Sequence, residues 1–160
     1  MPLPAFLAAR GLEGRVTLTC APGPQDAEAA AELVFGTYWN EGFSRATLTQ
    51  VHLGSSAWVG ARDASGRLVA TARAISDTGK RAWVYDVLVA PAWRGQRLGE
   101  AVMRLLLDHP AVRDVPRVYL ATRDAQDFYA RLGFGDRHET ETRLKAYTST
   151  EMVLSRPFDA

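Results

Sequence analysis

Alternation between apolar and polar residues predicts strands at four places in the first ninety residues. Residues 15–20 (RVTLTC) alternate with a period of two, which is typical of a half-buried strand. Residues 56–62 and 67–75 flank Asp63-Ala64-Ser65-Gly66, a hairpin signal, and residues 81–89 (RAWVYDVLV) read as a long strand. The pattern therefore predicts three consecutive antiparallel strands after the first one.

Helical periodicity separates these strands from the next ones. The segment PGPQDAEAAAELVFGTYW begins with proline and acidic residues, as a helix N-terminus does. Residues 44–53 read as a second short helix that starts with Ser44, a candidate N-cap. An apolar stripe of helical spacing runs from Leu98 to Leu106 and predicts a helix over residues 98–108. Residues 117–121 read as a strand, and residues 124–132 as a helix that Gly133 caps.

These elements predict an α+β fold. The strand 81–89, the helix 98–108 and the strand 117–121 form a β-α-β unit, so its two strands are expected to be parallel. The tail, at residues 134–143 and 149–154, can supply two more strands. We expect a mixed, mostly antiparallel sheet of about six to seven strands with helices on both faces. Residues 1–14 read as a loosely ordered lead-in and residues 15–160 as a single domain.

Composition narrows the classes of function. The 160 residues include 19 basic and 18 acidic ones, and the net charge of +1 argues against a nucleic-acid-binding protein. Cys20 is the only cysteine, so a disulfide within the chain is excluded; a buried strand position is favoured over a nucleophile. No apolar run is long enough for a membrane span or a signal peptide, and we expect a cytoplasmic protein. The scattered His52, His109 and His138 suggest surface or capping roles and no metal site.

We expect the functional site at the turn between the strand 81–89 and the helix 98–108. The turn after Val89 contains Arg94, Gly95 and Arg97, and a helix begins directly behind it. The unpaired N–H groups of a helix N-terminus attract phosphate, and arginines add charge. An ordinary strand-to-helix turn with exposed arginines is the alternative. The spacing fits neither a dinucleotide-binding fingerprint nor a P-loop.

Two motifs resemble the Gcn5-related N-acetyltransferase family. Arg94-Gly95-Gln96-Arg97-Leu98-Gly99 is similar to the coenzyme A pyrophosphate loop Gln/Arg-x-x-Gly-x-Gly/Ala, and Phe128-Tyr129-Ala130-Arg131-Leu132-Gly133-Phe134 is similar to the signature Leu-Tyr-x-x-x-Gly-Phe. The order of strands and helices matches the family over about residues 15–155. Arg97 departs from the family's glycine. We expect its backbone to keep a negative φ and its side chain to offer an added phosphate contact.

The resemblance implies an acetyl-CoA-dependent N-acetyltransferase that transfers the acetyl group to a primary amine by direct attack, without a metal. The acceptor would be a small molecule or a peptide. The alternative is a non-catalytic acyl-CoA-binding regulatory module on the same fold. Coenzyme-binding residues by resemblance are Val87, Leu88, Val89, Arg94, Gly95, Gln96, Arg97, Leu98, Gly99 and Thr122. A homodimer is also possible by the same resemblance.

Two residues are candidates for proton transfer. By resemblance Tyr129 would protonate the departing thiolate; a packed aromatic beside Phe128 is the alternative. Asp86 is a carboxylate in an apolar strand, where burial would raise its pKa toward that of a useful base. A solvated Asp86 and an ion pair with a core arginine are the alternatives. By resemblance the acceptor pocket would use residues 38–43 (YWNEGF) with parts of 136–150; ordinary packing is the alternative there.

Overall fold

The computed structural model describes residues 4–8, 10–143 and 152–156. They belong to two compact units, residues 1–120 and 121–159, and each unit is described by itself. The prediction of one domain over residues 15–160 stays a prediction.

The first unit contains a sheet whose five strands follow the order of the chain. β1, β2, β3 and β4 pair antiparallel, and β5 is parallel to β4. The expected antiparallel hairpins and the parallel β-α-β unit are therefore confirmed. The strand bounds are β1 Val16–Thr19, β2 Ala57–Asp63, β3 Leu68–Ser76, β4 Ala82–Val89 and β5 Val118–Tyr119.

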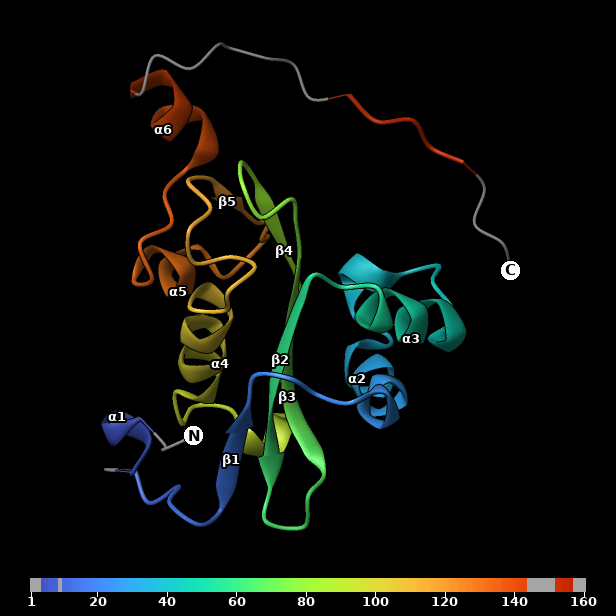
Figure 1. Cartoon of the computed structure of the whole chain (residues 1–160), viewed down its shortest axis with the longest axis vertical. Helices are drawn as coiled ribbons and strands as arrows, with labels where there is room; N and C mark the ends of the chain where they lie inside the picture. Colours follow the sequence, from blue (N-terminus) through green and yellow to red (C-terminus); the bar gives the residue numbers. More distant parts are fainter. Residues whose placement is uncertain (1–3, 9, 144–151, 157–160) are drawn as a thin grey trace. The chain divides into compact units, whose positions relative to one another are not determined.

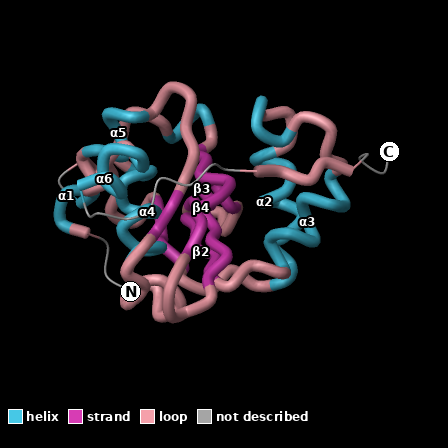
Figure 2. Tube along the Cα trace, turned by 90° about the horizontal axis from the view of Figure 1, so that it is seen from above, coloured by secondary structure: helices cyan, strands magenta, loops and turns pink. Residues whose placement is uncertain are grey.

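Helices cover both faces of this sheet. α2 and α3 lie on one face and α4 on the other (Figures 1 and 2). The bounds in the first unit are α1 Ala5–Ala8, η1 Pro24–Asp26, α2 Ala27–Val34, η2 Tyr38–Asn40, α3 Arg45–Leu53, η3 Pro91–Trp93 and α4 Leu98–Leu107. Ser44 caps α3 as expected, because its side chain accepts the Thr47 N–H at 3.1 Å. The mixed α+β class is confirmed.

Apolar stripes on these helices form the core. α4 buries Leu98, Val102 and Leu106, at the spacing that the sequence showed. α2 buries only alanines and Val34, so this helix lies close to the sheet. No helix among the described residues has the length and apolar content that a membrane crossing needs.

The described part of the N-terminal segment buries two leucines. Leu7 on α1 and Leu12 after it are fully buried. The expectation of a loosely ordered lead-in over residues 1–14 stays a prediction. Cys20 follows β1 and is exposed, so the expectation of a buried strand position is wrong.

The second unit differs most from the sequence-based expectation. It contains α5 Gln126–Ala130 and α6 Arg137–Arg143. The expected strand over 134–143 is wrong, because α6 occupies most of it. Residues 149–151 of the other expected strand lie outside the described residues, and residues 152–154 have no regular structure. The described sheet thus has five strands instead of six to seven.

Candidate active site

β4 continues well beyond the point where its pairing with β5 ends. The parallel register joins only Ala82 with Val118 and Trp83 with Tyr119, whereas β4 runs on to Val89. Beyond Tyr85, only β3 among the described strands pairs with β4. The β5-side edge of Val87–Val89 is therefore not paired with a strand in the described part of the chain, and these are three of the residues that the family resemblance implies for coenzyme binding.

A bulge in β4 coincides with this separation. Thr71 is opposite Leu88 and Arg73 is opposite Tyr85, so the register with β3 shifts between these pairs. Within the bulge Asp86 has φ +50°, in the left-handed region that residues other than glycine rarely adopt. Such a conformation costs about 1 kcal/mol and persists only where surrounding contacts hold it.

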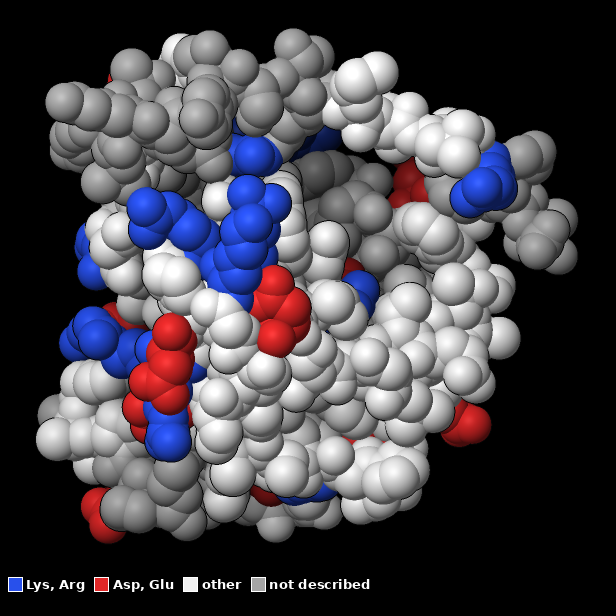
Figure 3. All heavy atoms as spheres, turned by 45° about the horizontal axis from the view of Figure 1, so that its top comes forward, with Lys and Arg blue, Asp and Glu red and all other residues white. Residues whose placement is uncertain are grey.

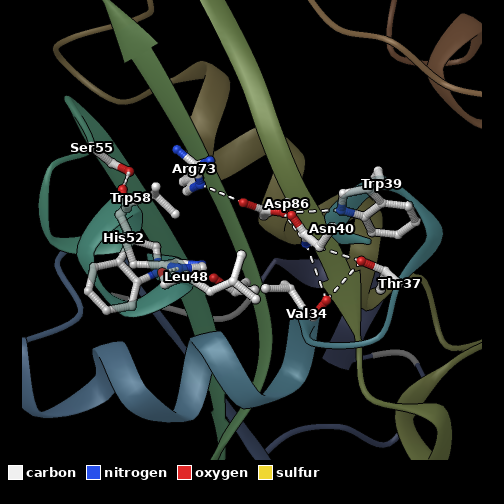
Figure 4. Close-up of polar contacts among 12 residues, drawn as sticks. Val34, Thr37, Trp39, Asn40, Leu48, His52, Ser55, Trp58, Arg73 and Asp86 are labelled. Carbon is white, nitrogen blue, oxygen red and sulfur yellow. Dashed lines mark hydrogen bonds and ion pairs between the residues drawn. The ribbon is translucent and has the colours of Figure 1, made fainter. Parts of the chain in front are cut away.

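Three side chains hold Asp86 in place. Its Oδ2 accepts from Arg73 Nε at 2.6 Å, and its Oδ1 accepts from Asn40 Nδ2 at 2.8 Å and from Trp39 Nε1 at 3.0 Å. Figure 4 shows the carboxylate between Arg73 on one side and the other two residues on the other. These contacts link β3, β4 and the 3-10 turn η2, and thereby fix the bulge.

The expectation that burial makes Asp86 a base is wrong in the direction of the pKa. Burial alone would raise it, but the Asn40 hydrogen bond and the Arg73 charge outweigh burial and hold the pKa below 3.8. A carboxylate this acidic and this fully bonded is a poor proton acceptor at neutral pH. The contacts favour the alternative left open by the sequence, an ion pair with a core arginine.

The turn from β4 to α4 has the shape of an anion-binding loop. Gly95 and Arg97 both have positive φ, +74° and +62°. The expected negative φ of Arg97 is wrong, because Arg97 occupies the left-handed N-cap position where the family pattern has glycine. Its side chain makes no capping hydrogen bond, so the first backbone N–H groups of α4 keep their affinity for an anion.

Arg97 uses its side chain elsewhere. The guanidinium binds both carboxylate oxygens of Glu100, at 2.7 and 2.8 Å, and lies 4.3 Å above the ring of Phe6. These bonds leave less of Arg97 for the added phosphate contact expected from the sequence. They also neutralise Glu100, which otherwise would repel an anion from the helix N-terminus.

Two further arginines contact the same loop. Arg94 Nε donates to Val89 O at 2.9 Å, and Arg10 donates to Gly95 O at 3.2 Å. Arg94 is exposed at this position. The loop predicted from Arg94 to Gly99 is thus lined by arginines, one of which, Arg10, the sequence did not single out.

The Tyr-x-x-x-Gly-Phe signature forms a helix cap in the second unit. Gly133 has φ +93°; its N–H donates to Ala130 O, and the Phe134 N–H donates to Tyr129 O. Both bonds and the ring contact between Tyr129 and Phe134 at 5.9 Å define a Schellman motif. The expectation that Gly133 caps this helix is confirmed.

Tyr129 and Thr122 therefore have structural partners as well as predicted roles. Tyr129 is half-buried and also meets Phe128 edge-on, with ring centroids 4.9 Å apart. Thr122 Oγ1 accepts the Ala125 N–H at 3.0 Å, ahead of α5. Their roles toward acid catalysis and the pantetheine arm remain predictions.

Residues 38–43, which were expected to line the acceptor pocket, differ in their contacts. Trp39 and Asn40 hold Asp86, whereas Glu41 and Gly42 are exposed. Trp39 still exposes 41% of its surface, so it bonds the carboxylate and presents a ring at once.

Sequence reasoning missed two buried residues. Arg73 faces Asp86 from the neighbouring strand. Only the register between β3 and β4 reveals this pair, and the sequence would have supplied that register if the type of turn between the two strands had been known. His52 was expected at the surface and is buried. Its Nδ1 lies 2.7 Å from Leu48 O, and its Nε2 has no partner. In the described residues no three His, Cys, Asp or Glu side chains gather as a metal site.

Comparison with known proteins agrees with this geometry. The family model described as "Acetyltransferase (GNAT) family" matches residues 25–134. A solved structure assigned to the GNAT family from Xanthomonas campestris pv. campestris is 30% identical, with a TM-score of 0.71, and the match covers 89% of this chain and 94% of that one. The chain belongs to the GNAT acetyltransferase family.

Two curated relatives match a shorter segment. The uncharacterized N-acetyltransferase ycf52 of Porphyra purpurea is 40% identical over 73 residues, 45% of this chain and 42% of that protein. Histone acetyltransferase TAP1 of Glycine max is 41% identical over 69 residues, 42% of this chain and 30% of that protein. The chain thus matches less than half the length of these relatives.

Proposed function

We propose that this protein is an acetyl-CoA-dependent N-acetyltransferase with a small-molecule amine as acceptor. The observation that carries the proposal is the edge of β4 that no described strand pairs with, followed through η3 and the turn to Arg97 by an α4 N-terminus without a side-chain cap. A strand edge provides hydrogen bonds for an amide-containing arm, and the helix N-terminus provides N–H groups for phosphates. Family membership supports the same function.

The residues present fit coenzyme A as a substrate. The backbone of Val87, Leu88 and Val89 would bind the pantetheine arm, and Arg94 to Gly99 would bind the pyrophosphate. Arg94 now occupies Val89 O, so this contact would be exchanged for one with the coenzyme. A backbone N–H of the same strand would stabilise negative charge that develops on the thioester oxygen.

The reaction requires two proton movements. The acceptor nitrogen forms a bond to the acetyl carbon, the carbon–sulfur bond breaks, and the amine loses a proton while the thiolate gains one. We assign the second transfer to Tyr129. We assign no base role to Asp86, because its ion pair with Arg73 keeps it ionised and bonded; the amine proton would pass to solvent.

The test is coenzyme A release, measured with a thiol reagent over a library of amines, together with calorimetric titration of acetyl-CoA. The proposal requires binding of acetyl-CoA and release that depends on an amine. Binding without release over the whole library would instead support the non-catalytic regulatory module. Absence of binding at millimolar acetyl-CoA would refute both.

The Tyr129→Phe variant tests the assignment of the acid. We expect kcat to fall by about 10²-fold or more, the range typical of a lost general acid, with the affinity for acetyl-CoA unchanged. Phe134→Leu is the control, since it alters the same aromatic pair and leaves the phenol. Equal kcat in Tyr129→Phe and the wild type would remove Tyr129 from the mechanism.

A further inference from the structure

Arg73 is a buried arginine that uses only one of its three guanidinium nitrogens. The residue is 9% exposed, and its Nε donates to Asp86. In the described part of the chain, His52 Nε2 is the one buried side-chain nitrogen or oxygen without a partner, and neither Nη of Arg73 forms a hydrogen bond. Both Nη atoms must therefore keep contact with solvent. Figure 4 shows them turned away from Asp86.

The partners of Asp86 leave Arg73 able to bind a second anion. Oδ1 of that carboxylate already accepts two hydrogen bonds from the neutral donors Trp39 and Asn40. Its charge is therefore stabilised without the Nη atoms of Arg73. A guanidinium offers two separate edges, and the edge formed by its two Nη atoms matches the two oxygens of a carboxylate.

One exposed aromatic ring adjoins this cation, and a second lies beyond Asp86. The Tyr85 ring centroid lies 5.0 Å from the Arg73 guanidinium carbon, and Tyr85 exposes 43% of its surface. Trp39, on the far side of Asp86 in Figure 4, exposes 41%. An exposed ring beside a charged group is suited to an amphipathic small molecule, whose apolar part would lie against the ring.

The position along β4 relates this site to the chemistry. Tyr85, the strand partner of Arg73, precedes Val87 by two residues, and the bulged Asp86 lies between them. An anion bound at Arg73 thus lies near the edge where the thioester would be held. The short separation favours an acceptor whose anionic group and amine are only a few atoms apart.

We propose that Arg73 is a specificity-determining residue that binds the carboxylate of the acceptor, and that the acceptor is a free amino acid with an apolar or aromatic side chain. The inference rests on the proposed function and narrows its acceptor class. Tyr85 and Trp39 would flank the side chain of that amino acid.

The test compares phenylalanine with phenylalaninamide and phenethylamine, which keep the amine and lose the carboxylate charge. Because a hydrogen bond to a charged group contributes about 1.5–3 kcal/mol, kcat/KM for phenylalanine should exceed both others by at least about 10-fold. Arg73→Lys keeps a positive charge beside Asp86 and removes the pair of Nη atoms that would bind the carboxylate. It should raise KM for phenylalanine about 10-fold more than KM for phenethylamine, so that the preference for phenylalanine is lost.

Controls separate recognition from folding and from the proposed function. Arg81→Lys changes an exposed arginine beside β4 and should have no effect; the melting temperature of each variant reports on folding. Equal efficiency for the three amines, an equal loss for all three in Arg73→Lys, or a preference for O-phosphoethanolamine would overturn the inference and leave the acetyltransferase intact.

A binding experiment decides the inference if no amine supports turnover. Calorimetry of N-acetylphenylalanine and N-acetylphenylalaninamide, with and without coenzyme A, should show tighter binding of the acid that Arg73→Lys abolishes. Equal binding of both compounds would overturn the carboxylate site. Failure of the proposed function alone would appear as carboxylate binding without coenzyme A binding.

Discussion

At the scale of single residues, the hydrogen-bond and charge partners of a buried carboxylate decide the direction in which its pKa shifts. A buried carboxylate without partners has a raised pKa, and this reasoning led from the sequence to Asp86 as a base. The structure supplies three donors, whose hydrogen bonds and charge reverse the direction of the shift. The apolar residues around Asp86 in β4 indicate that this side chain is buried. Its hydrogen-bond donors, however, come from η2 and β3, and no local sequence pattern identifies them.

Asp86→Asn should destabilise the protein strongly. The change leaves the Arg73 guanidinium buried without a counter-ion, which typically costs about 3–5 kcal/mol. Urea denaturation would measure the loss in the free energy of unfolding. Asp114→Asn is the matched control: Asp114 also pairs with an arginine, but its side chain is 82% exposed, so little change is expected. A loss below about 1 kcal/mol in Asp86→Asn would contradict the structural role.

Arg97 allows backbone strain and side-chain contacts to be separated. Arg97→Ala removes the bonds to Glu100 and retains a Cβ at φ +62°, whereas Arg97→Gly removes both the bonds and the strain. The glycine variant should therefore be more stable than the alanine variant by about 1 kcal/mol, measured by thermal unfolding.

Coenzyme A binding to the same two variants tests whether the backbone or the Arg97 side chain of this loop binds the phosphate. If the backbone N–H groups of α4 are the principal anion donors, Arg97→Gly should bind coenzyme A within about 5-fold of the wild type. A much larger loss in calorimetry would assign the Arg97 side chain a direct phosphate contact after all.

At the scale of elements, local signals predicted more than long-range ones did. Alternation identified β2 to β4, and the Ser44 cap and the Leu98–Leu106 stripe identified α3 and α4. The tail was misread because residues 137–143 (RHETETR) carry no apolar period, and α6 begins there behind Asp136, whose side chain accepts the Glu139 N–H at 3.0 Å. The β4 bulge was also missed, since a left-handed aspartate depends on distant partners and leaves no mark in the pattern.

Gly133→Ala should weaken the end of α5. A methyl group at Gly133 meets no atom within 4 Å, so the cost arises from φ +93° alone and should be about 1 kcal/mol. Because the same cap positions Tyr129, kcat should fall along with the unfolding free energy. Gly79→Ala is the control, at a turn glycine without positive φ. An unchanged melting temperature would show that the Schellman motif is not needed.

At the scale of the whole molecule, a nearly neutral net charge conceals local differences. Among the described residues, arginines such as Arg62, Arg73 and Arg97 form ion pairs with carboxylates, and Figure 3 shows blue and red side chains next to one another on one face. Arg10 and Arg94 instead bond backbone carbonyls in the loop before α4, where positive charge remains for a phosphate ligand. A single anionic coenzyme needs no greater excess than this.

Buried His52 should make the stability of the protein sensitive to mild acid. Burial lowers its pKa from 6.5, outweighing the Leu48 hydrogen bond and the nearby charge of Asp86, so the folded protein keeps it neutral when the unfolded chain takes up a proton. The unfolding free energy should therefore fall as pH drops below 6.5, by up to about 1.4 kcal/mol per pH unit for one proton.

Equilibrium unfolding in urea between pH 7.5 and about pH 5 measures this slope, because carboxylates titrate mainly below that range. His52→Gln should flatten the slope, leaving the smaller part due to half-buried His109, whose pKa burial also lowers. His138→Gln alters an exposed histidine and should leave the slope as in the wild type. If His52→Gln retained the full pH dependence, the buried Nε2 without a partner would have no part in the acid sensitivity, and the proton would bind elsewhere.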